Sequence, residues 1–401
     1  MFEKVTNCRV CQSQILEKLL DLGNFHLSGT FPTSKNQVIE KGPLSLLLCG
    51  DCGLVQLAHQ YDMEKLFGDN YGYRSGLNSQ MVGHLNDFVD EVLKKEELTP
   101  EDLIVDIGSN DGTLLSRFPT SFKSLVGVDP TGPKFKKYYP KHIKLIPEFF
   151  SAGKFGEEKA KLITSFSMFY DLADPLNFMK EVSEILDDDG IWVMEQSYLP
   201  LMIKNNAYDC ICHEHQEYYC LSQIKYMAFK VGLNILDVSF NNTNGGSIRV
   251  SLGKRNGEKK DLVNSILNKE KRFRYISTYR FFINNLKNNK KNLVNLLSHL
   301  KNKGKKVVGL GASTKGNITL QYCGIDESLL SRIFEVNEYK FNRFTPGTNI
   351  PISAEKDFDS ADYKLVLPWH LKESFIESEK DFLKKGGKLI FPLPHLEIIG
   401  H

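Results

Sequence analysis

Short apolar runs and amphipathic stretches alternate along the middle of the chain. The apolar runs are short enough to be buried strands, and they lie at 103–107, 124–130, 162–172 and 190–199. Apolar residues recur with helical spacing over 82–98 and again in the stretch ADPLNFMKEVSEIL, which follows the third run. Because strands that alternate with helices build sheets covered by helices, this order predicts an α/β fold.

The C-terminal half repeats the theme of a strand, a glycine-rich turn and a helix. It does so in KKVVGLGASTKGNITLQYCGI, residues 305–325, and later strands are predicted at 365–371 and 386–394. Residues 254–306 are rich in lysine and asparagine but keep helical apolar spacing. We therefore expect a connecting helix with a solvated basic face there, and a phosphate-binding surface is the alternative.

Length and composition restrict the class of protein. A chain of 401 residues exceeds a typical single core, so two or three domains are expected. The formal net charge of +2 gives no reason to expect nucleic acid or a membrane surface as partner. No apolar run approaches the roughly 20 residues that span a bilayer, and the first residues lack a hydrophobic signal core. We expect a cytoplasmic protein with reduced cysteines and no obligate protein partner.

Two C-x-x-C pairs near the N-terminus predict a metal site. Cys8 and Cys11 form one pair, and Cys49 and Cys52 form the other. Each pair places two thiolates on one tight turn, and two such turns supply the four sulfur ligands that structural zinc prefers. The alternative is a set of four unrelated buried cysteines. We predict one structural zinc ion in a closed site.

The stretch DLIVDIGSNDGTLLSRF predicts a strand, a glycine-rich turn and the start of a helix. Such a turn offers backbone N–H groups and a positive helix end to a ligand. The pattern is D-x-G-x-x-x-G, from Asp106 through Gly108 to Gly112, and resembles motif I of class I S-adenosylmethionine-dependent methyltransferases. Asp129 ends the next strand about twenty residues later, where an acid can accept both ribose hydroxyls. An NAD-type Rossmann domain is the alternative.

Several polar side chains are expected at the same end of this sheet. In an open α/β sheet, ligands bind at the carboxyl ends of the strands. We therefore expect Asp106, Asp129, the segment 165–170 with Ser167, and the segment 195–197 to converge on one crevice. The stretch YDCICHEHQEYYCLS follows soon after, and its three consecutive ionisable residues suit an acid–base site. A second metal site built from Cys210, Cys212, His213 and His215, or a wholly structural cluster, are the alternatives.

Five motifs together resemble those of the sugar-nucleotide C-methyltransferases. They are the paired zinc knuckles, VDIGSNDG, HEHQEYY, NGGSIRV and GLGASTKGN, and the resemblance covers nearly the whole chain. It implies a zinc-binding lobe over 1–75, a class I methyltransferase domain of Rossmann-like fold over 76–255, and a Rossmann-like nucleotide-sugar-binding domain over 256–401. The activity implied is methyl transfer to carbon, beside the ketone of a nucleotide-linked 4-keto-deoxysugar, with S-adenosylmethionine as cofactor.

The resemblance also implies roles for particular residues. His215 would be the base that removes the proton beside the ketone, with Glu214 positioning the sugar or tuning the histidine, and His213 structural. Tyr73 can reach the ligand, although it suits a packing role equally well. Asp106, Gly108, Asn110, Asp129 and Ser167 are expected to bind the cofactor, with Phe149 or Phe150 near its adenine. The nucleotide-diphosphate sugar would contact Asn244, Ser313, Thr314, Lys315 and His370.

The chain departs from the family pattern at three positions. Some members carry a tyrosine where Cys212 stands, a histidine near Asp171 and a histidine where Asn244 stands. A thiol is a weaker hydrogen-bond donor than a phenol, and Tyr73, Tyr170 or Tyr218 could supply the donor to the ketone oxygen instead. The alternative functions are O-methylation of a sugar and binding without turnover. Nucleic-acid methylation conflicts with the near-neutral charge.

Overall fold

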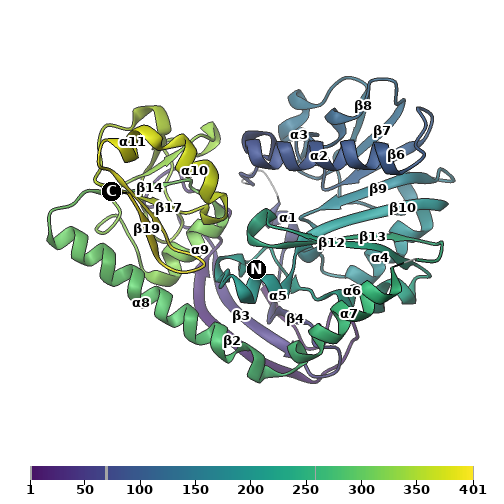
Figure 1. The fold of residues 1–401 in the computed structure, drawn as a ribbon, viewed down its shortest axis with the longest axis horizontal. Coiled ribbons are helices and arrows are strands. Elements are labelled where there is room, and N and C mark those ends of the chain that lie inside the picture. Colours follow the sequence, from purple (N-terminus) through teal and green to yellow (C-terminus); the bar gives the residue numbers. More distant parts are fainter. Residues whose placement is uncertain (1, 68–70, 258, 401) are drawn as a thin grey trace.

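The structure is a computed structural model that describes residues 2–67, 71–257 and 259–400. Figure 1 shows two α/β units on either side of a small antiparallel lobe formed by the first strands of the chain. The described residues form sheets of two, four, seven and six strands. Within the described residues no helix is both long enough and apolar enough to cross a bilayer.

The N-terminal lobe is built on a four-stranded antiparallel sheet in the order β11-β4-β3-β2. Its strands are β2 (Leu16–His26), β3 (Lys41–Cys49), β4 (Val55–Leu57) and β11 (Glu217–Tyr218), and beside it lie β1 (Phe2–Lys4), β5 (His59–Tyr61) and helix α1 (Met63–Leu66). Strand β11 comes directly after the H-E-H stretch, so this sheet takes an edge strand from the middle of the chain.

The central unit is a seven-stranded sheet in the order β12-β13-β10-β9-β6-β7-β8. Strand β13 runs antiparallel to both of its neighbours, and the pairs from β10 to β8 are parallel. The strands are β6 (Leu103–Ile107), β7 (Ser124–Val128), β8 (Ile143–Ile146), β9 (Ala160–Phe166), β10 (Leu186–Ser197), β12 (Asn234–Asn241) and β13 (Ser247–Gly253), and the helices are α2 (Ser79–Lys95), α3 (Gly132–Phe135), α4 (Pro175–Ile185), α5 (Leu199–Lys204) and α6 (Leu221–Lys230).

Two helix boundaries in this unit differ from the sequence prediction. The helix expected at 82–98 begins at Ser79, because the Asn78 side chain caps it by accepting from two backbone N–H groups. The helix expected to start in TLLSRF is only a 3₁₀ turn over Leu115–Arg117. Pro119 explains this, since a proline disfavours helical geometry in the residue before it, and Phe118 is extended.

The C-terminal unit is a six-stranded sheet in the order β16-β15-β14-β17-β18-β19, parallel except for the last strand. Its strands are β14 (Val307–Leu310), β15 (Ile333–Glu335), β16 (Ile352–Ala354), β17 (Tyr363–Val366), β18 (Lys388–Phe391) and β19 (Glu397–Ile399). The helices of this half are α7 (Lys260–Glu270), α8 (Arg280–Asn302), α9 (Thr314–Cys323), α10 (Lys372–Ser378) and α11 (Lys380–Lys384).

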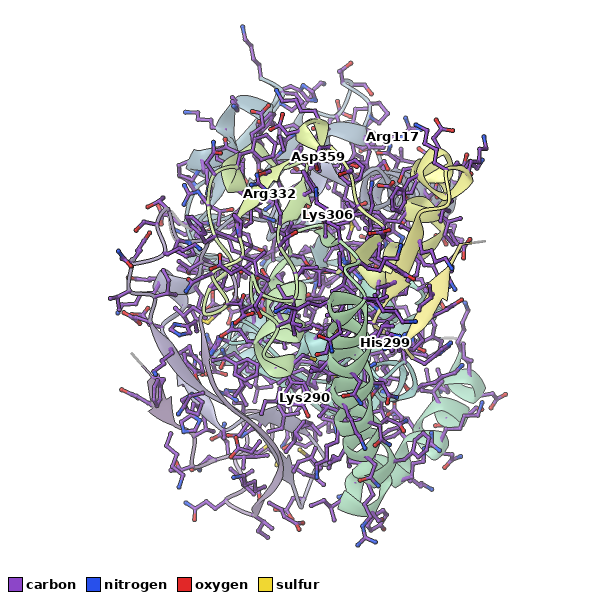
Figure 2. The ribbon with its side chains drawn as sticks, turned by 90° about the vertical axis from the view of Figure 1, so that its left-hand side faces the viewer. Arg117, Lys290, His299, Lys306, Arg332 and Asp359 are labelled. Atoms are coloured by element: carbon purple, nitrogen blue, oxygen red, sulfur yellow. The ribbon has the colours of Figure 1, made fainter. Side chains whose placement is uncertain are left out.

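Helix α8 is the connecting helix predicted in the lysine-rich region. Its apolar side chains Phe282, Leu286, Leu293, Leu297 and Leu300 are buried. Lys290 and His299 lie along α8 in Figure 2 and are exposed, and Lys306, just after the helix, pairs with Asp359. The basic run is therefore the solvent-facing side of an amphipathic helix.

The N-terminal lobe packs against both α/β units. Cys8, Cys49 and Leu54 join the core that contains Trp192 and other side chains of the central sheet. The opposite part of the lobe, with Leu46 among others, joins a core that reaches the C-terminal sheet. The lobe is thus a wedge between the two α/β units. The domain boundaries at 75/76 and 255/256 stay a prediction. Strand β11 lies beyond the first boundary in the sequence but belongs to the sheet of the N-terminal lobe.

Candidate active site and zinc centre

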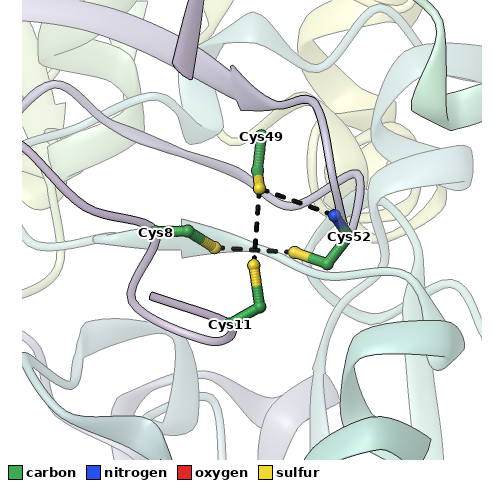
Figure 3. Close-up of side chains that lie close together, drawn as sticks. All are labelled: Cys8, Cys11, Cys49 and Cys52. Carbon is green, nitrogen blue, oxygen red and sulfur yellow. Dashed lines mark hydrogen bonds between the residues drawn. The ribbon is translucent and has the colours of Figure 1, made fainter. Parts of the chain in front are cut away.

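The four cysteines of the two knuckles converge at one point, as Figure 3 shows. The sulfur of Cys8 lies 3.5 Å from that of Cys52, and the sulfur of Cys11 lies 3.6 Å from that of Cys49. Four thiolates that bind zinc at about 2.3 Å lie about 3.8 Å apart in a tetrahedron, so the cluster fits the ion. This is the one group of metal-ligating side chains found together in 2–67, 71–257 and 259–400.

Arg9, inside the first knuckle, ties the zinc centre to the H-E-H stretch. Its Nη1 donates to the carbonyl oxygen of Gln216 at 3.3 Å, and its Nη2 donates to the Gln216 side chain at 3.0 Å. Its Nε lies 3.4 Å from a carboxylate oxygen of Glu217. The backbone N–H of Gln216 donates in turn to the carbonyl oxygen of Tyr170 at 2.7 Å. The residues just after His215 are therefore fixed from two sides.

A cavity of about 200 Å³ opens at the carboxyl ends of β6 and β7. All the residues expected to bind the cofactor line it, namely Asp106, Gly108, Asn110, Asp129, Phe149, Phe150 and Ser167. The residues that the sequence predicts for cofactor binding therefore all lie in one cavity. That each of them contacts the cofactor stays a prediction.

The turn after β6 is shaped to bring its backbone close to a ligand. Gly108 has a φ of +78°, and a Cβ there would meet Met168 at 2.9 Å, so a side chain does not fit. Asn110 also has a positive φ, and its N–H donates to Oδ2 of Asp129 at 2.7 Å. Oδ1 of Asp129 accepts from the backbone N–H of Thr131 at 2.7 Å. Asp129 is thereby held rigidly at the cavity wall.

Asp106 lies deeper than Asp129 in the same wall. It is 4% exposed, and it accepts a hydrogen bond from the Thr164 hydroxyl at 2.7 Å. Burial raises the pKa of Asp106 to about 7, against the lowering effect of this hydrogen bond. Burial likewise raises the pKa of Asp129. A cationic ligand would favour the charged form of both acids.

A second cavity of about 370 Å³ lies between the central and C-terminal units. The residues expected to be catalytic line it, and these are Tyr73, Glu214 and His215. The residues expected to bind the nucleotide sugar line it too, and these are Asn244, Ser313, Thr314, Lys315 and His370. The Lys315 ammonium donates to the carbonyl oxygen of Asn244 at 3.0 Å, which links the two units across the cavity.

His215 is held as a neutral imidazole. Its Nδ1 lies 2.8 Å from the carbonyl oxygen of Cys210, which can only accept, so Nδ1 carries the hydrogen and Nε2 has the free lone pair. Its ring packs against that of Tyr170 at an interplanar angle of 50°, with centroids 4.2 Å apart. Burial, and then the charge of Lys315, lower the pKa of His215 to about 3. This arrangement presents a base rather than an acid.

His213 and Tyr218 lie outside both cavities. His213 is fully buried in the lobe, where its ring packs edge-on against Tyr61, and it lines neither cavity. Tyr218 donates weakly to the carbonyl oxygen of Cys210 at 3.5 Å and also lines neither cavity.

Glu195 departs from the expected crevice. It is buried beneath α2, where its carboxylate accepts from His84 at 2.5 Å and from Arg249 at 2.7 Å. It lines neither of the two cavities. Gln196 and Ser197 also line neither of the two cavities, so the whole segment 195–197 lies outside the expected crevice. The expectation failed for Glu195 because tertiary contacts decide where its side chain lies, and His84 and Arg249 hold it beneath α2.

The two cavities share part of their walls. Phe67, Tyr71, Tyr73, Ser167 and Asp171 line both of them. Tyr73 is 39% exposed, whereas Asp171 is 8% exposed. A group bound in one cavity therefore meets a group bound in the other at this shared wall.

Sequence reasoning missed Glu335 in the larger cavity. Glu335 ends β15, the strand after the glycine turn of the C-terminal unit, just as Asp129 ends β7. It accepts from the backbone N–H groups of Val336 and Asn337, and Lys340 lies 3.7 Å away. The signal was available, since an acid about twenty residues after a glycine-rich turn is a ribose-binding pattern.

The central sheet order, the D-x-G turn and the acid at the end of the next strand define a class I S-adenosylmethionine-dependent methyltransferase. Three family models match the chain in succession. They describe a zinc binding domain over residues 8–67, a methyltransferase domain over 77–238 and a C-methyltransferase C-terminal domain over 242–394. The chain belongs to the S-adenosylmethionine-dependent C-methyltransferases with an N-terminal zinc-binding domain.

One curated relative matches along nearly its whole length. The C-methyltransferase NovU of Streptomyces niveus is 29% identical over 409 residues, which cover 98% of this chain and 97% of NovU. A solved S-adenosylmethionine-dependent methyltransferase from Clostridium acetobutylicum is 19% identical, with a TM-score of 0.35, and covers 44% of this chain and 92% of its own. The methyltransferase bound to the Trm112 activator of Haloferax volcanii has a TM-score of 0.38 and is 13% identical, covering 45% of this chain and 94% of its own.

Proposed function

We propose that this enzyme methylates a carbon atom beside the ketone of a nucleotide-linked 4-keto-deoxysugar. The observation that carries the proposal is His215, which lines the larger cavity as a neutral imidazole with a free lone pair on Nε2. A carbon acid beside a ketone needs such a base within reach of its proton. S-adenosylmethionine would supply an electrophilic methyl group from the smaller cavity.

The larger cavity has the features of a nucleotide site. Helix α9 begins at the cavity, its first turn is capped by Ser313, and Lys315 adds a positive charge. A helix N-terminus with a lysine suits a diphosphate. Glu335 stands where an acid accepts ribose hydroxyls, so the nucleoside would lie toward β15 and the sugar toward His215.

The proposed reaction uses the shared wall of the two cavities. His215 takes the proton from the carbon next to the ketone, and the resulting enolate carbon attacks the methyl group. Glu214 lies beside His215 in the cavity wall, where it would orient the sugar hydroxyls. Burial is the main cause of the low pKa of His215, and the positive charge of Lys315 adds to it. Binding of a diphosphate at Lys315 would offset that charge and strengthen the base.

A labelling experiment tests the proposal. Wild-type enzyme, a nucleoside-diphosphate 4-keto-6-deoxyhexose and a non-transferring cofactor analogue are incubated in D₂O, and the exchange of the α hydrogen is followed by NMR. We expect exchange with wild type and with His299→Ala, a matched control on the exposed face of α8, but not with His215→Ala. Turnover of His215→Ala should fall about 10²–10⁴-fold, the usual contribution of a positioned base.

O-methylation of a sugar hydroxyl is the other candidate, because it also needs a base at this position. It breaks no C–H bond on the sugar. Methylated product that fully retains the α hydrogen would therefore refute C-methylation and support the alternative.

A further inference from the structure

Asp171 occupies an unusual position in the active site. It closes the short 3₁₀ turn Phe169–Asp171 that follows β9, and its side chain lines both cavities. The residue is 8% exposed, and nothing in the proposed reaction has yet used it. In the proposed reaction the sugar carbon and the methyl group meet at this shared wall, so an acidic side chain there can take part in the chemistry.

The surroundings of Asp171 do not suit a carboxylate anion. Its Oδ1 is fully enclosed and has no hydrogen-bond partner among the described residues. A buried anionic oxygen without a donor is costly, whereas a neutral acid carries its own proton. The carboxyl group therefore reaches the cavities through Oδ2.

Glu214, the other carboxyl group of this wall, is supported differently. Ser28 donates to its Oε2 at 3.5 Å, and its Oε1 lies so close to Gly29 that a Cβ there would approach within 2.6 Å. Burial raises the pKa of Glu214, and the hydrogen bonds that it accepts, from Cys212, Ser28 and the backbone of Gly29 among others, oppose that rise and favour its charged form. When two nearby carboxyl groups cannot both ionise, the one whose charged form accepts more hydrogen bonds becomes the anion, and here that is Glu214.

The charges around Asp171 point the same way. Burial, and then the negative charges of Glu214 and Glu217, hold the pKa of Asp171 well above its usual range. Its titratable neighbours Tyr71, Tyr170 and Cys212 have pKa values raised by burial and stay neutral. Among the described residues, no cation is found to lower the pKa of Asp171.

We propose that Asp171 is a further catalytic residue, a neutral carboxylic acid whose Oδ2 donates a hydrogen bond to the ketone oxygen of the substrate. This inference rests on the proposed C-methylation. A developing oxyanion needs a donor placed before the reaction starts. The thiol of Cys212, which lines the same cavity, is a poor donor, whereas a protonated carboxyl group carries an O–H that can donate.

The step balances without another reactant. His215 Nε2 takes the proton from carbon, and the C–H electron pair forms the enolate, whose oxygen accepts the Asp171 O–H. The electrons then return to form the new carbon–carbon bond as the S–CH₃ bond breaks and leaves a neutral thioether. Asp171 keeps its proton throughout, and the His215 imidazolium releases its proton to solvent.

Two substitutions separate the donor role from a packing role. Asp171→Asn keeps an N–H donor and cannot ionise, so it should exchange the α hydrogen of the 4-keto-6-deoxyhexose probe within about tenfold of wild type. Asp171→Ala removes the donor and should lose about 10²–10³-fold, the usual effect of one oxyanion donor. Calorimetry should show cofactor affinity near wild type for both. Wild-type exchange should fall as Asp171 ionises at high pH, and Asp171→Asn should lack that fall.

Infrared spectroscopy gives a readout that needs no turnover. The wild-type-minus-Asp171→Asn difference spectrum at pH 7 should contain the C=O band of a protonated carboxyl group. Equal exchange losses in the two variants, near-normal exchange in Asp171→Ala, or the absence of that band would overturn the inference. If wild type itself exchanges no hydrogen yet transfers methyl groups, C-methylation has failed, and the role of Asp171 at an enolate falls with it.

Discussion

The ion pair between Arg9 and Glu217 supports a quantitative stability prediction. The two side chains are only 5% and 0% exposed, and neither carboxylate oxygen of Glu217 has a hydrogen-bond partner among the described residues. Burial raises the pKa of Glu217, and the positive charge of Arg9 opposes that rise. Replacing Arg9 with methionine keeps most of the volume but leaves Glu217 buried without a counter-charge.

Loss of one member of a buried pair costs about 3–5 kcal/mol. The substitution also removes the donors to Leu57, Gln60 and Gln216. We therefore expect Arg9→Met to lower the opening free energy of the lobe by at least about 3 kcal/mol. That loss corresponds to amide exchange roughly 100-fold faster in β3 and β4.

Hydrogen exchange followed by mass spectrometry measures this directly, with peptides of the distant β18 as an internal reference. The matched control is the double variant Arg9→Met/Glu217→Gln, which leaves no buried charge. The loss of opening free energy in the double variant should be smaller, by about 1–3 kcal/mol, than the sum of the losses in Arg9→Met and Glu217→Gln. If the two costs simply add, or if Arg9→Met leaves the lobe as protected as wild type, then this reasoning about the pair is wrong.

Three further predictions concern the metal, the cofactor and the base. Cys49→Ser should reduce zinc from about one ion per chain and destabilise the lobe, as elemental analysis and thermal unfolding would reveal, and metal-free protein of full stability would refute a structural zinc. Asp129→Ala should weaken S-adenosylmethionine binding about tenfold or more in calorimetry, because hydrogen bonds to a charged acceptor contribute about 1.5–3 kcal/mol each; an unchanged affinity would contradict its assigned role. Lys315→Met should raise the pKa of His215 from about 3 toward its ordinary value, because the neighbouring charge disappears; a pH titration of the imidazole by NMR that shows no change would exclude this coupling.

The zinc cysteines and the cofactor turn were predictable because their signals are local. Cys8 with Cys11, and Asp106 with Gly108, are close in sequence, and the rules for parallel sheets then bring Asp129 to the same edge. The placement of Glu195 was not predictable, because its orientation depends on His84 and Arg249, which tertiary packing brings to it. Asp171 was missed as a donor because only the folded chain shows that its Oδ1 is enclosed and unpartnered.

Strand β11 has a consequence for how such enzymes can be recombined. The strand pairs with β4, so the chain that carries the base is also an edge of the zinc lobe. Exchanging only the first 75 residues between two relatives would place a foreign β4 against the native β11 and a foreign Arg9 against the native Gln216. A working chimera therefore has to inherit residues 213–220 together with the lobe, although about 140 positions of the amino-acid sequence separate them.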